Sequence, residues 1–594
     1  MEHGMSYFIS PCRYACPLMR PIQRYNVLLS YLGKLVKAGL AKEEVFLGIY
    51  DELFNFNPLF GICGYICGIC ENYCNRKELD QPVQVRFTER FLFDWYKKTV
   101  SEGKIPPYRP IDIAPAKEEE VAIIGGGPAG LTAAFFLAKE GYKITLFESK
   151  SKLGGALQLI PSFRLPKEVL AFAIDQIVTP LSIDVRLNTK IPMNDLEKDY
   201  KAILVATGTP LPRPVPPFAQ DYKGVETAVE ILGQISEGTI DRDKYKGKKV
   251  VVIGGSGVSI DTARSLRRLG GEVALACLES ADRTSKDGIL ANEEDEEAGK
   301  QEGIIFYYSR GLDKVEKNNN KLHLTFSLCT SVYDLKDGKK MFNPQFDVND
   351  TISLDTDYLV FAIGQLSDRE YLKELLDEKG RLSVDPLTLA TSKQGVFVAG
   401  DVFRIGRASE AIRAGKEAAQ SIKRFLQNKD LKIGRQKIEY ISRGLPSTKE
   451  RIPLKPAQKT PFLPVEQRLH SFDLEQAGFS LDQVILETER CLHCDSCDNC
   501  EACVTLGFRE EVGKMYVIEE NCDGCGYCVD VCVYGAIKVI EYMKNDEMKK
   551  TVEVNTSLCR GCGSCQATCP KEGCAIPGFT LAEFRKEINN YLKV

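Results

Sequence analysis

Histidine and tryptophan are scarce in this sequence, with four and one among 594 residues. None of the histidines stands in a paired motif, which argues against a hydrolytic site built on a histidine base. Long apolar runs are missing too: no stretch approaches the roughly 20 residues that span a bilayer. The opening "MEHGMSYFISPCRYACP" lacks a basic segment followed by an apolar one. We therefore expect a cytoplasmic protein with no membrane span.

A surplus of either charge is also missing. The formal net charge is -4 and 27% of the residues are charged, the balance of an ordinary globular protein. Without a basic surplus, the chain is not expected to bind nucleic acid. A length of 594 residues predicts about three to five domains.

Cysteine is nearly absent from the middle of the chain and abundant at both ends. Six of the 22 cysteines lie in the first 74 residues, and fourteen follow residue 490. Between them stand Cys277, in the apolar run "VALACL", and Cys329, in "TFSLCT"; both are expected to be buried core thiols. The terminal cysteines form C-x2-C runs in a large chain, a pattern that favours thiolate ligation of a metal or cluster over disulfides.

The middle of the chain opens with a strand, a glycine-rich turn and a helix. In "EEVAIIGGGPAGLTAAFFLAKEGYKITLFE", an apolar strand runs into Gly125-x-Gly127-x-x-Gly130, and a second strand ends in Glu148. The first glycine permits the tight turn, the second lets the backbone approach a pyrophosphate, and the third lets the helix pack on the strand. The helix N-terminus favours phosphate charge, and Glu148 can accept hydrogen bonds from a ribose. This unit predicts a dinucleotide site.

A second unit of the same kind begins in "KKVVVIGGSGVSIDTARSLRRLGGEVALACLES". Its fingerprint is imperfect, because Ser256 and Ser259 occupy the second and third glycine positions if Gly254 is the first. Glu279 ends the second strand, where a carboxylate hydrogen-bonds a 2'-hydroxyl and repels a 2'-phosphate. This favours NAD(H) over NADP(H), although Arg283 stands close by and Glu279 could merely flank a turn.

Two copies of C-x2-C-x2-C-x3-C follow residue 520, in "CDGCGYCVDVC" and "CRGCGSCQATC". This is the bacterial ferredoxin run, in which a short loop holds three corners of a cubane and the fourth cysteine ligates the other cluster. Zinc is the alternative, but paired zinc sites do not require the third cysteine of each loop. The predicted ligand sets are Cys522, Cys525 and Cys528 with Cys569, and Cys559, Cys562 and Cys565 with Cys532, which leaves Cys574 as a spare buried thiol.

Several separated motifs resemble those of one class of flavoprotein. "VATGTP" (205–210), "FAIGQLSD" (361–368) and "GVFVAGDVFRIGRASEAIRAGKEAAQSI" (395–422) are similar to motifs of the two-domain, disulfide-reductase-like flavoproteins. "GGALQLIPSFRLPKEVL", "PCRYACP" and "NPLFGICGYICGICENYCNR" resemble, more specifically, the glutamate synthase small-subunit family. The resemblance implies FAD beside an NAD(P)H site. It places Asp401 at the flavin ribityl chain and the helix near Ala411 with its N-terminus toward the isoalloxazine ring.

The candidate cofactor contacts follow from the two glycine-rich units and this resemblance. For FAD they are Gly125, Gly127, Ala129, Gly130, Glu148, Gly155, Arg164, Thr207, Gly208, Gly400, Asp401 and Ala411. For NAD(H) they are Gly254, Gly255, Ser256, Gly257, Ser259, Asp261, Glu279 and Gly364.

The resemblance also implies iron-sulfur ligands near the N-terminus, in an abbreviated set. Full-length members place two more cysteines before the position of Cys12, whereas this chain has six thiols and Glu71 as a candidate carboxylate ligand. Two cubanes need eight ligands, so we expect one N-terminal 4Fe-4S cluster and leave a second open. The six thiols are Cys12, Cys16, Cys63, Cys67, Cys70 and Cys74.

The stretch "CLHCDSCDNCEAC", residues 491–503, repeats cysteine at every third position. Each such step turns about 300° on a helix, so these thiols cannot share one helix face and a loop around a cluster is expected. Cys491 is either an alternate ligand or the missing ligand of a neighbouring site. We expect this cluster to relay electrons between the flavoprotein and the ferredoxin-like tail, on the ligands Cys494, Cys497, Cys500 and Cys503.

The expected fold is multidomain α/β: a helical iron-sulfur domain, a disulfide-reductase-like flavoprotein with two dinucleotide-binding domains, and a ferredoxin-like α+β domain. The expected boundaries are 1–110 for the helical domain, 118–245 and 350–428 for the FAD domain, 246–349 for the NAD(P)H domain, 429–485 for a linker, 486–520 for a cysteine-rich cluster segment and 521–594 for the ferredoxin-like domain.

Together these parts predict an oxidoreductase that moves electrons between NAD(H), FAD and four 4Fe-4S clusters, with a fifth cluster left open. The expected partner is a catalytic or electron-accepting protein subunit, or a ferredoxin. One alternative is a bifurcating flavin that couples NAD(H) to high- and low-potential acceptors. Another is an assembly scaffold with structural clusters, which the several nucleotide and flavin motifs argue against.

Overall fold

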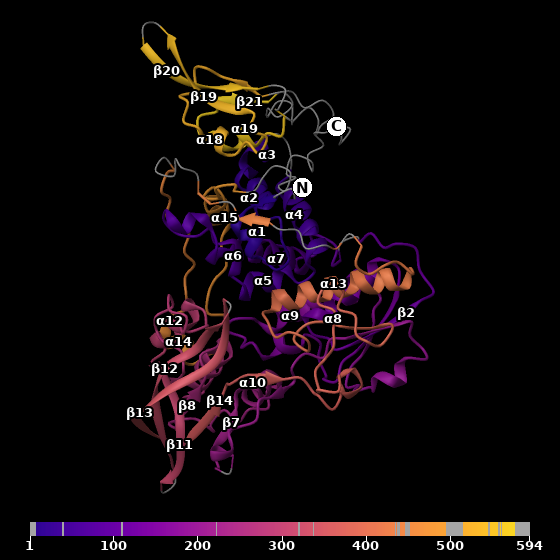
Figure 1. Ribbon diagram of the computed structural model, residues 1–594, viewed down its shortest axis with the longest axis vertical. Coiled ribbons are helices and arrows are strands. Elements are labelled where there is room, and N and C mark those ends of the chain that lie inside the picture. The colour runs from indigo at the N-terminus through magenta and orange to yellow at the C-terminus, as the bar shows by residue number, and fades with distance from the viewer. Residues whose placement is uncertain are drawn as a thin grey trace. The chain divides into compact units, whose positions relative to one another are not determined.

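The computed structural model describes residues 7–37, 41–108, 111–220, 222–318, 321–336, 338–433, 435, 440–442, 444–445, 452–494, 515–544, 547–555, 559 and 561–576. Contacts between residues divide the chain into two units. We call residues 1–110, 432–460 and 478–594 the cysteine unit, and residues 111–431 and 461–477 the two-sheet unit. Figure 1 labels some of the helices and strands of each unit.

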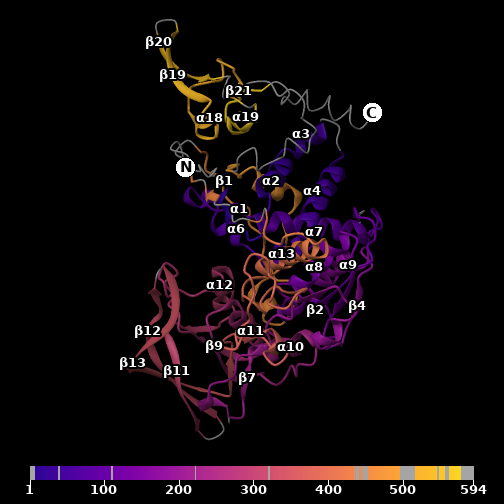
Figure 2. The ribbon, with the colours of Figure 1, turned by 45° about the vertical axis from the view of Figure 1, so that its right-hand side comes forward.

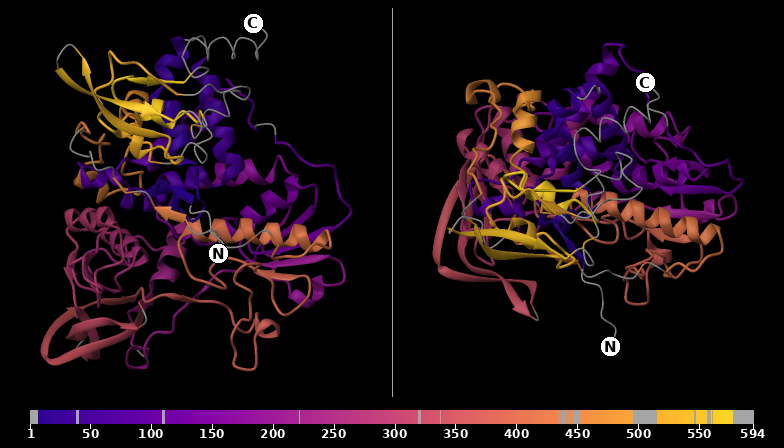
Figure 3. Two further views of the ribbon diagram at one scale, coloured as in Figure 1. Left: turned by 45° about the horizontal axis from the view of Figure 1, so that its top comes forward. Right: turned by 90° about the horizontal axis from the view of Figure 1, so that it is seen from above.

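The first sheet of the two-sheet unit is parallel, with the strand order β16-β5-β2-β3-β4. Its strands β5 and β16 are buried along their whole length, because a parallel sheet is covered on both faces. Helices α8 and α13 pack on each other and on this sheet, and α13 is the long orange helix of Figure 3. The elements are β2 (Glu120–Ile124), α8 (Pro128–Lys139), β3 (Lys143–Phe147), α9 (Lys167–Val178), β4 (Asp184–Arg186), β5 (Ala202–Val205), β16 (Val396–Val398) and α13 (Ala408–Leu426).

The second sheet is also parallel, with the order β10-β9-β8-β14-β7. Strands β7 and β14 lie outside the range 246–349 that the sequence assigns to the NAD(P)H domain. They join it because β8 pairs with β14 on the side away from β9, and β7 in turn pairs with β14. The elements are β7 (Val225–Thr227), α10 (Ala228–Glu237), β8 (Lys249–Ile253), α11 (Gly257–Arg268), β9 (Glu272–Ala276), α12 (Glu293–Gln301), β10 (Ile305–Tyr307) and β14 (Tyr358–Phe361).

Three long antiparallel strands lie between β10 and β14 in the chain and form a sheet of their own, which is plainly seen in Figure 2. They are β11 (Arg310–Asn318), β12 (Lys321–Lys336) and β13 (Lys339–Thr356). Apolar side chains of β12, such as Leu324 and Phe326, share a buried core with Val251 and Leu359 of the second parallel sheet. The chain passes between the two parallel sheets twice, once after β5 and once after β14. The short strands β6 (Leu211–Pro212) and β15 (Gln365–Leu366) lie in these two connections and pair with each other.

The expected linker, residues 429–485, carries structure of its own in its described part. It contains α14 (Val465–Arg468) and the start of α15 (Leu481–Thr488), and residues 461–477 belong to the two-sheet unit. Glu475 is buried there and accepts hydrogen bonds from Arg264 (3.0 Å) and Arg268 (2.6 Å). Both arginines also pair with buried Glu302, at 2.7 and 2.8 Å. Arg468 of the segment adds a third buried cation, 3.5 Å from Glu302, so a network of buried arginines and glutamates anchors the segment.

The N-terminal part of the cysteine unit is helical, as expected. Helix α5 approaches α7 closely because glycines face it: a Cβ on Gly61 would stand 2.1 Å from the Phe93 ring. Tyr50 stacks on Tyr96 with ring centroids 3.9 Å apart, which fixes α4 against α7. The helices are α1 (Pro11–Ala15), α2 (Ile22–Ser30), α3 (Leu32–Lys37), α4 (Lys42–Phe56), α5 (Phe60–Ile66), α6 (Ile69–Asn72) and α7 (Val85–Ser101).

The C-terminal part of the cysteine unit repeats one small motif. Strand β18 (Tyr516–Val517) pairs with β21 (Cys574–Ala575), and β19 (Ile537–Lys544) forms a hairpin with β20 (Glu547–Val554). The short helices α18 (Tyr527–Asp530) and α19 (Ser564–Thr568) pack on each other. Among the helices of the described residues, none has the length and apolarity to cross a membrane.

We expect Gly415→Ala to destabilise the two-sheet unit. Its Cβ would stand 2.2 Å from the backbone oxygen of Ala129, so α13 would have to move off α8. Overpacking of this kind costs about 1–3 kcal/mol, which should lower the melting temperature by about 3–10 °C. The control is Gly233→Ala in α10, where a Cβ meets nothing within 4 Å and the change should be neutral or slightly stabilising. Equal melting temperatures for the two variants would contradict the close approach of α8 and α13.

Candidate functional site

The first glycine-rich turn joins β2 to α8 and has no room for side chains. Gly125 has a φ of 109°, and a Cβ there would stand 2.4 Å from the backbone oxygen of Ala206. A Cβ on Gly130 would stand 1.9 Å from the backbone oxygen of Gly125. Gly127, in contrast, faces only the Cα of Gly155, at 3.8 Å from a Cβ built on it. The N-terminus of α8 is therefore left open to a ligand, as a phosphate site requires.

Glu148 closes the second strand of this unit and reaches back to the turn. Its carboxylate is buried and accepts hydrogen bonds from the backbone N–H of Gly126 and of Lys150, both at 2.8 Å. The acid thus lies beside the turn, where the sequence places it.

Other predicted flavin contacts surround the same helix N-terminus. A Cβ on Gly400 would stand 3.0 Å from the Cβ of Ala129 and 3.9 Å from that of Ala411, so these three residues meet. Burial raises the pKa of Asp401, whose carboxylate accepts a hydrogen bond from the backbone N–H of Gly406 at 3.1 Å. The hydroxyl of Thr207 is buried and has no hydrogen-bond partner among the described residues. A buried hydroxyl without a partner and a cradle of small residues suit a polar, extended group such as FAD.

Arg164 forms ion pairs with Asp261 and Asp295. Its guanidinium donates to both carboxylate oxygens of Asp261, at 2.8 and 2.9 Å, and lies 3.1 Å from Asp295. Although burial opposes the charge, these two carboxylates raise the pKa of Arg164. The structure thus brings together a residue expected at FAD and a residue expected at NAD(H), and joins them to each other.

The second glycine-rich turn joins β8 to α11. Gly254 has a φ of 141°, and a Cβ there would stand 2.5 Å from the backbone oxygen of Ala362. The Ser259 hydroxyl donates to the backbone oxygen of Ser256 at 2.6 Å, so a serine fits where the fingerprint has its third glycine. Two further predicted positions, Gly257 at the start of α11 and Gly364 with a φ of 109°, lie after β8 and after β14.

Glu279 lies against this turn. A Cβ on Gly255 would stand 2.3 Å from its carboxylate oxygen, so the acid and the turn are in contact. Burial raises the pKa of Glu279. The nearby Arg283 is engaged elsewhere: it pairs with Glu296 and donates to the backbone oxygen of Ala291 at 2.6 Å.

The ferredoxin-like cysteines gather in one core. Cys522, Cys525, Cys528 and Cys569, the first predicted ligand set, line a single pocket. Three residues of the second set, Cys532, Cys559 and Cys565, lie in the core that also contains Cys522, Cys528 and Cys569. The two halves match: the backbone N–H of Ala536 donates to Cys532 Sγ at 3.3 Å, and that of Gly573 donates to Cys569 Sγ at 3.1 Å.

Glycine permits the loops between these cysteines. Gly524 and Gly526 have φ angles of 68° and 86°, and Gly561 and Gly563 have 64° and 82°, so both runs use left-handed residues at matching positions. Cys574, expected to be a spare thiol, is buried and lines the pocket of the first set. In the described part of the chain, no three histidine, cysteine or acidic side chains lie close enough to hold a single metal ion. The donor sets are thiols, which suit iron-sulfur clusters.

Four N-terminal cysteines, Cys16, Cys63, Cys67 and Cys70, lie about a buried ion pair. Arg20 donates to Cys16 Sγ at 3.3 Å and pairs with Glu89, which also accepts a hydrogen bond from Tyr25 at 2.6 Å. Glu89 interacts with Cys63 and Cys70 as well, and burial raises the pKa of both thiols. The sequence offers no signal for Glu89, because one acid in an amphipathic helix reads as a surface charge. Glu71, the expected carboxylate, accepts a hydrogen bond from the backbone N–H of Arg86 at 2.7 Å.

Of the five cysteines in the block 491–503, the structure describes Cys491 and Cys494, both partly exposed. Cys497, Cys500 and Cys503 lie outside the described residues. The expected relay cluster therefore stays a prediction.

Comparison with known proteins agrees with this geometry. Residues 119–415 match the family described as pyridine nucleotide-disulphide oxidoreductase, and residues 521–572 match a 4Fe-4S dicluster domain. The chain belongs to the pyridine nucleotide-disulphide oxidoreductase family. The predicted fold class is confirmed, as is the resemblance to FAD/NAD(P) oxidoreductases that carry a C-terminal 4Fe-4S dicluster domain.

Several known proteins are similar to this chain over most of its length. The NADP(+)-dependent formate dehydrogenase subunit beta of Moorella thermoacetica is 31% identical, over 83% of this chain and 72% of the relative. The NADPH-Fe(3+) oxidoreductase subunit beta of Geobacter sulfurreducens is 26% identical, over 82% and 75%. The NAD-dependent dihydropyrimidine dehydrogenase subunit PreT of Escherichia coli is 26% identical, over 70% and 91%. Among solved structures, Lactococcus lactis thioredoxin reductase matches 52% of this chain and 100% of its own, with 21% identity and a TM-score of 0.39.

We expect the effects of substituting Arg164 and Asp261 on the free energy of unfolding to be strongly non-additive. Arg164→Met would leave Asp261 and Asp295 as buried carboxylates without their cation, and Asp261→Asn would remove half of the countercharge. Each change should lower the urea midpoint of the full-length chain, followed by circular dichroism. The double variant should lower it no further than the worse single change.

The exposed pair Lys143–Glu120 in the same unit provides the control, since its removal should shift the midpoint little. Additive effects of Arg164→Met and Asp261→Asn would show that the two residues act separately.

Proposed function

We propose that this chain is the electron-transfer flavoprotein subunit of an NAD(H)-linked oxidoreductase. It moves electrons between NAD(H), FAD and 4Fe-4S clusters, and exchanges them with a catalytic partner subunit or a ferredoxin. The observation that carries the proposal is the combination, in one chain, of two glycine-rich turns on parallel sheets with thiol-lined sites in the cysteine unit. The subunit names of the Moorella and Geobacter relatives support a partner protein.

The first glycine-rich turn binds the pyrophosphate of FAD. Gly125 and Gly127 keep its backbone bare, the N-terminus of α8 faces the phosphate charge, and Glu148 accepts hydrogen bonds from the adenosine ribose. The hydroxyl of Thr207 and the carboxylate of Asp401 supply buried polar atoms along the rest of the cofactor. When bound, FAD converts the two-electron chemistry of nicotinamide into the one-electron chemistry of iron-sulfur clusters.

The second glycine-rich turn binds NAD(H), and Glu279 sets the preference for it over NADP(H). Its carboxylate lies against Gly255, where it can accept hydrogen bonds from a 2'-hydroxyl and repel a 2'-phosphate. Arg283, which could bind a 2'-phosphate, is held by Glu296. The named relatives include enzymes of both nucleotides, so the preference is argued from Glu279 alone.

The ferredoxin-like part binds two 4Fe-4S clusters. One uses Cys522, Cys525, Cys528 and Cys569, which line one pocket. The other uses Cys559, Cys562, Cys565 and Cys532. With one N-terminal cluster and the cluster of residues 491–503, the proposed total is four, and the second N-terminal site is taken up below.

Anaerobic purification with flavin and iron counts tests the proposal. We expect one FAD per chain, and we expect NADH to reduce a viologen dye, because the clusters return electrons one at a time. A preparation without bound FAD and without NADH-driven viologen reduction would overturn it. Oxidation of NADH that requires a high-potential and a low-potential acceptor together would instead favour a bifurcating flavin.

Glu279→Ala should weaken the use of NADH and narrow its preference over NADPH by about tenfold, equivalent to about 1.4 kcal/mol. The measurement is kcat/KM for both nucleotides with a viologen acceptor. The control is Glu272→Ala, an exposed acid at the other end of β9, which should leave both values unchanged. Unchanged kinetics in Glu279→Ala would remove this residue from the site.

A further inference from the structure

Two cysteines far along the chain lie beside the N-terminal thiols within the cysteine unit. The six N-terminal cysteines are two short of the eight that a pair of cubanes needs. Cys491 and Cys494 are held near them by a network of hydrogen bonds that joins the segment after Cys74 to the segment before Cys491.

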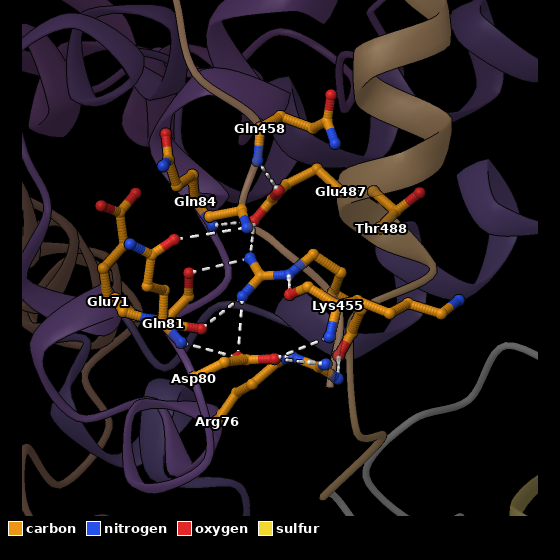
Figure 4. Close-up of polar contacts among 12 residues, drawn as sticks. Glu71, Arg76, Asp80, Gln81, Gln84, Lys455, Gln458, Glu487 and Thr488 are labelled. Carbon is orange, nitrogen blue, oxygen red and sulfur yellow. Dashed lines mark hydrogen bonds and ion pairs between the residues drawn. The ribbon is translucent and has the colours of Figure 1, made fainter. Parts of the chain in front are cut away.

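Arg490 is at the centre of this network. Its side chain is 1% exposed and lies 3.0 Å from Asp80 and 2.5 Å from Glu487. It also donates to the backbone oxygens of Gln81 (2.5 Å) and Pro82 (3.1 Å). Figure 4 shows the carboxylates of Asp80 and Glu487 facing each other across the network. A buried cation with this many acceptors fixes the end of α15 on the loop that follows Cys74.

Arg76 and Glu487 provide further hydrogen bonds between the segment after Cys74 and the segment before Cys491. Arg76 donates to the backbone oxygen of Arg490 at 2.8 Å and to both carboxylate oxygens of Asp80, at 2.9 and 2.7 Å. Glu487 accepts a hydrogen bond from the backbone N–H of Gln84 at 2.9 Å. Burial opposes the charge on Asp80, but the hydrogen bonds from Arg76 and from backbone N–H groups hold the pKa of Asp80 well below its usual value. Since Arg490 adjoins Cys491 and Arg76 lies two residues after Cys74, the thiols of both segments are brought to one place.

Direct contacts at the thiols agree with this arrangement. The side-chain amide of Asn75 donates to Cys494 Sγ at 3.4 Å, across 419 residues of sequence. Cys12 is the second residue of α1, which packs on α6, the helix that leads to Cys74. The Cys494 thiol also interacts electrostatically with Cys491, Cys12 and Cys74, so the four thiols are neighbours.

We propose that Cys12, Cys74, Cys491 and Cys494 together bind one 4Fe-4S cluster. The other N-terminal thiols, Cys16, Cys63, Cys67 and Cys70, then form a second complete set around Arg20. The two missing N-terminal ligands are thus supplied from the beginning of the cysteine block 491–503. The inference rests on the proposed function only for the nature of the bound group.

The assignment removes Cys494 from the expected relay set with Cys497, Cys500 and Cys503. It also puts the new site beside the ferredoxin-like part, because Cys491 and Cys494 line a pocket together with Tyr527 and Thr568. A cluster there would receive electrons close to the first residues of α18 and the last of α19.

The test measures iron, acid-labile sulfide and the electron paramagnetic resonance spectrum of the full-length, dithionite-reduced protein. The variants are Cys12→Ala, Cys74→Ala, Cys491→Ala and Cys494→Ala. We expect each to lose about four iron atoms, the content of one cubane, and each to lose the same signal. The double variant Cys12→Ala/Cys494→Ala should lose no more iron than either single variant.

Two controls separate this site from its alternatives. Cys277→Ala, a buried thiol of the two-sheet unit, should keep all of its iron. Cys500→Ala should keep the electron paramagnetic resonance signal that Cys12→Ala loses. If Cys494→Ala instead matches Cys500→Ala and differs from Cys12→Ala, or if the double variant loses two clusters, the proposal is wrong.

Serine variants keep the proposal testable if an alanine variant does not fold. Serine at any of the four positions should shift one common signal, and shifts in different signals would overturn the assignment. The proposed function fails independently, through absent FAD or absent viologen reduction in the unaltered protein, whereas the iron counts of the variants do not depend on NADH.

Discussion

A buried arginine determines where the two ends of the cysteine unit meet. Arg490 has carboxylates on two sides and donates to backbone oxygens on the others, so its charge and its N–H groups have partners within the protein. Leaving either carboxylate unpaired in that place would cost several kcal/mol. Short helices such as α1 and α6 bury too little surface to fix the thiols by packing alone, and the network supplies the missing rigidity. The relative position of the segments that carry Cys74 and Cys491 therefore depends on buried ion pairs, whereas the ferredoxin-like cysteines lie in a hydrophobic core.

In the two-sheet unit, buried ion pairs also hold a segment that is distant in the sequence. Its returning segment, residues 461–477, is fixed by Glu475 against Arg264 and Arg268, and Phe163 packs under the Arg268 guanidinium at 3.7 Å. Arg468 of the same segment also lies 3.5 Å from Glu302, so three buried arginines share two buried carboxylates, and these ion pairs offset part of the cost of desolvation. In both units, parts of the expected linker, residues 429–485, are fixed by hydrogen bonds and ion pairs of buried arginines and glutamates.

The sequence was sufficient for the parts whose chemistry is local. A glycine turn between a strand and a helix, or three cysteines in a ferredoxin loop, carries its geometry in the spacing, and the family and the fold class followed from such motifs. The sheet boundaries did not follow, because β7 and β14 join the second sheet across long crossovers. Glu89, Arg490 and the Arg164–Asp261 pair could not be predicted either. Each is a charged residue whose partner lies elsewhere in the sequence, and no pattern distinguishes it from a charge on the surface.

The contact between Asn75 and Cys494 has a consequence for how the protein is made. A ribosome adds about 5–20 residues per second, so the 419 residues between them take on the order of 20–80 seconds to synthesise. During that time the N-terminal helices can fold, yet one of their clusters would lack half of its ligands. Cluster insertion at this site would therefore wait until the flavoprotein has been synthesised, and a truncated chain could not complete it.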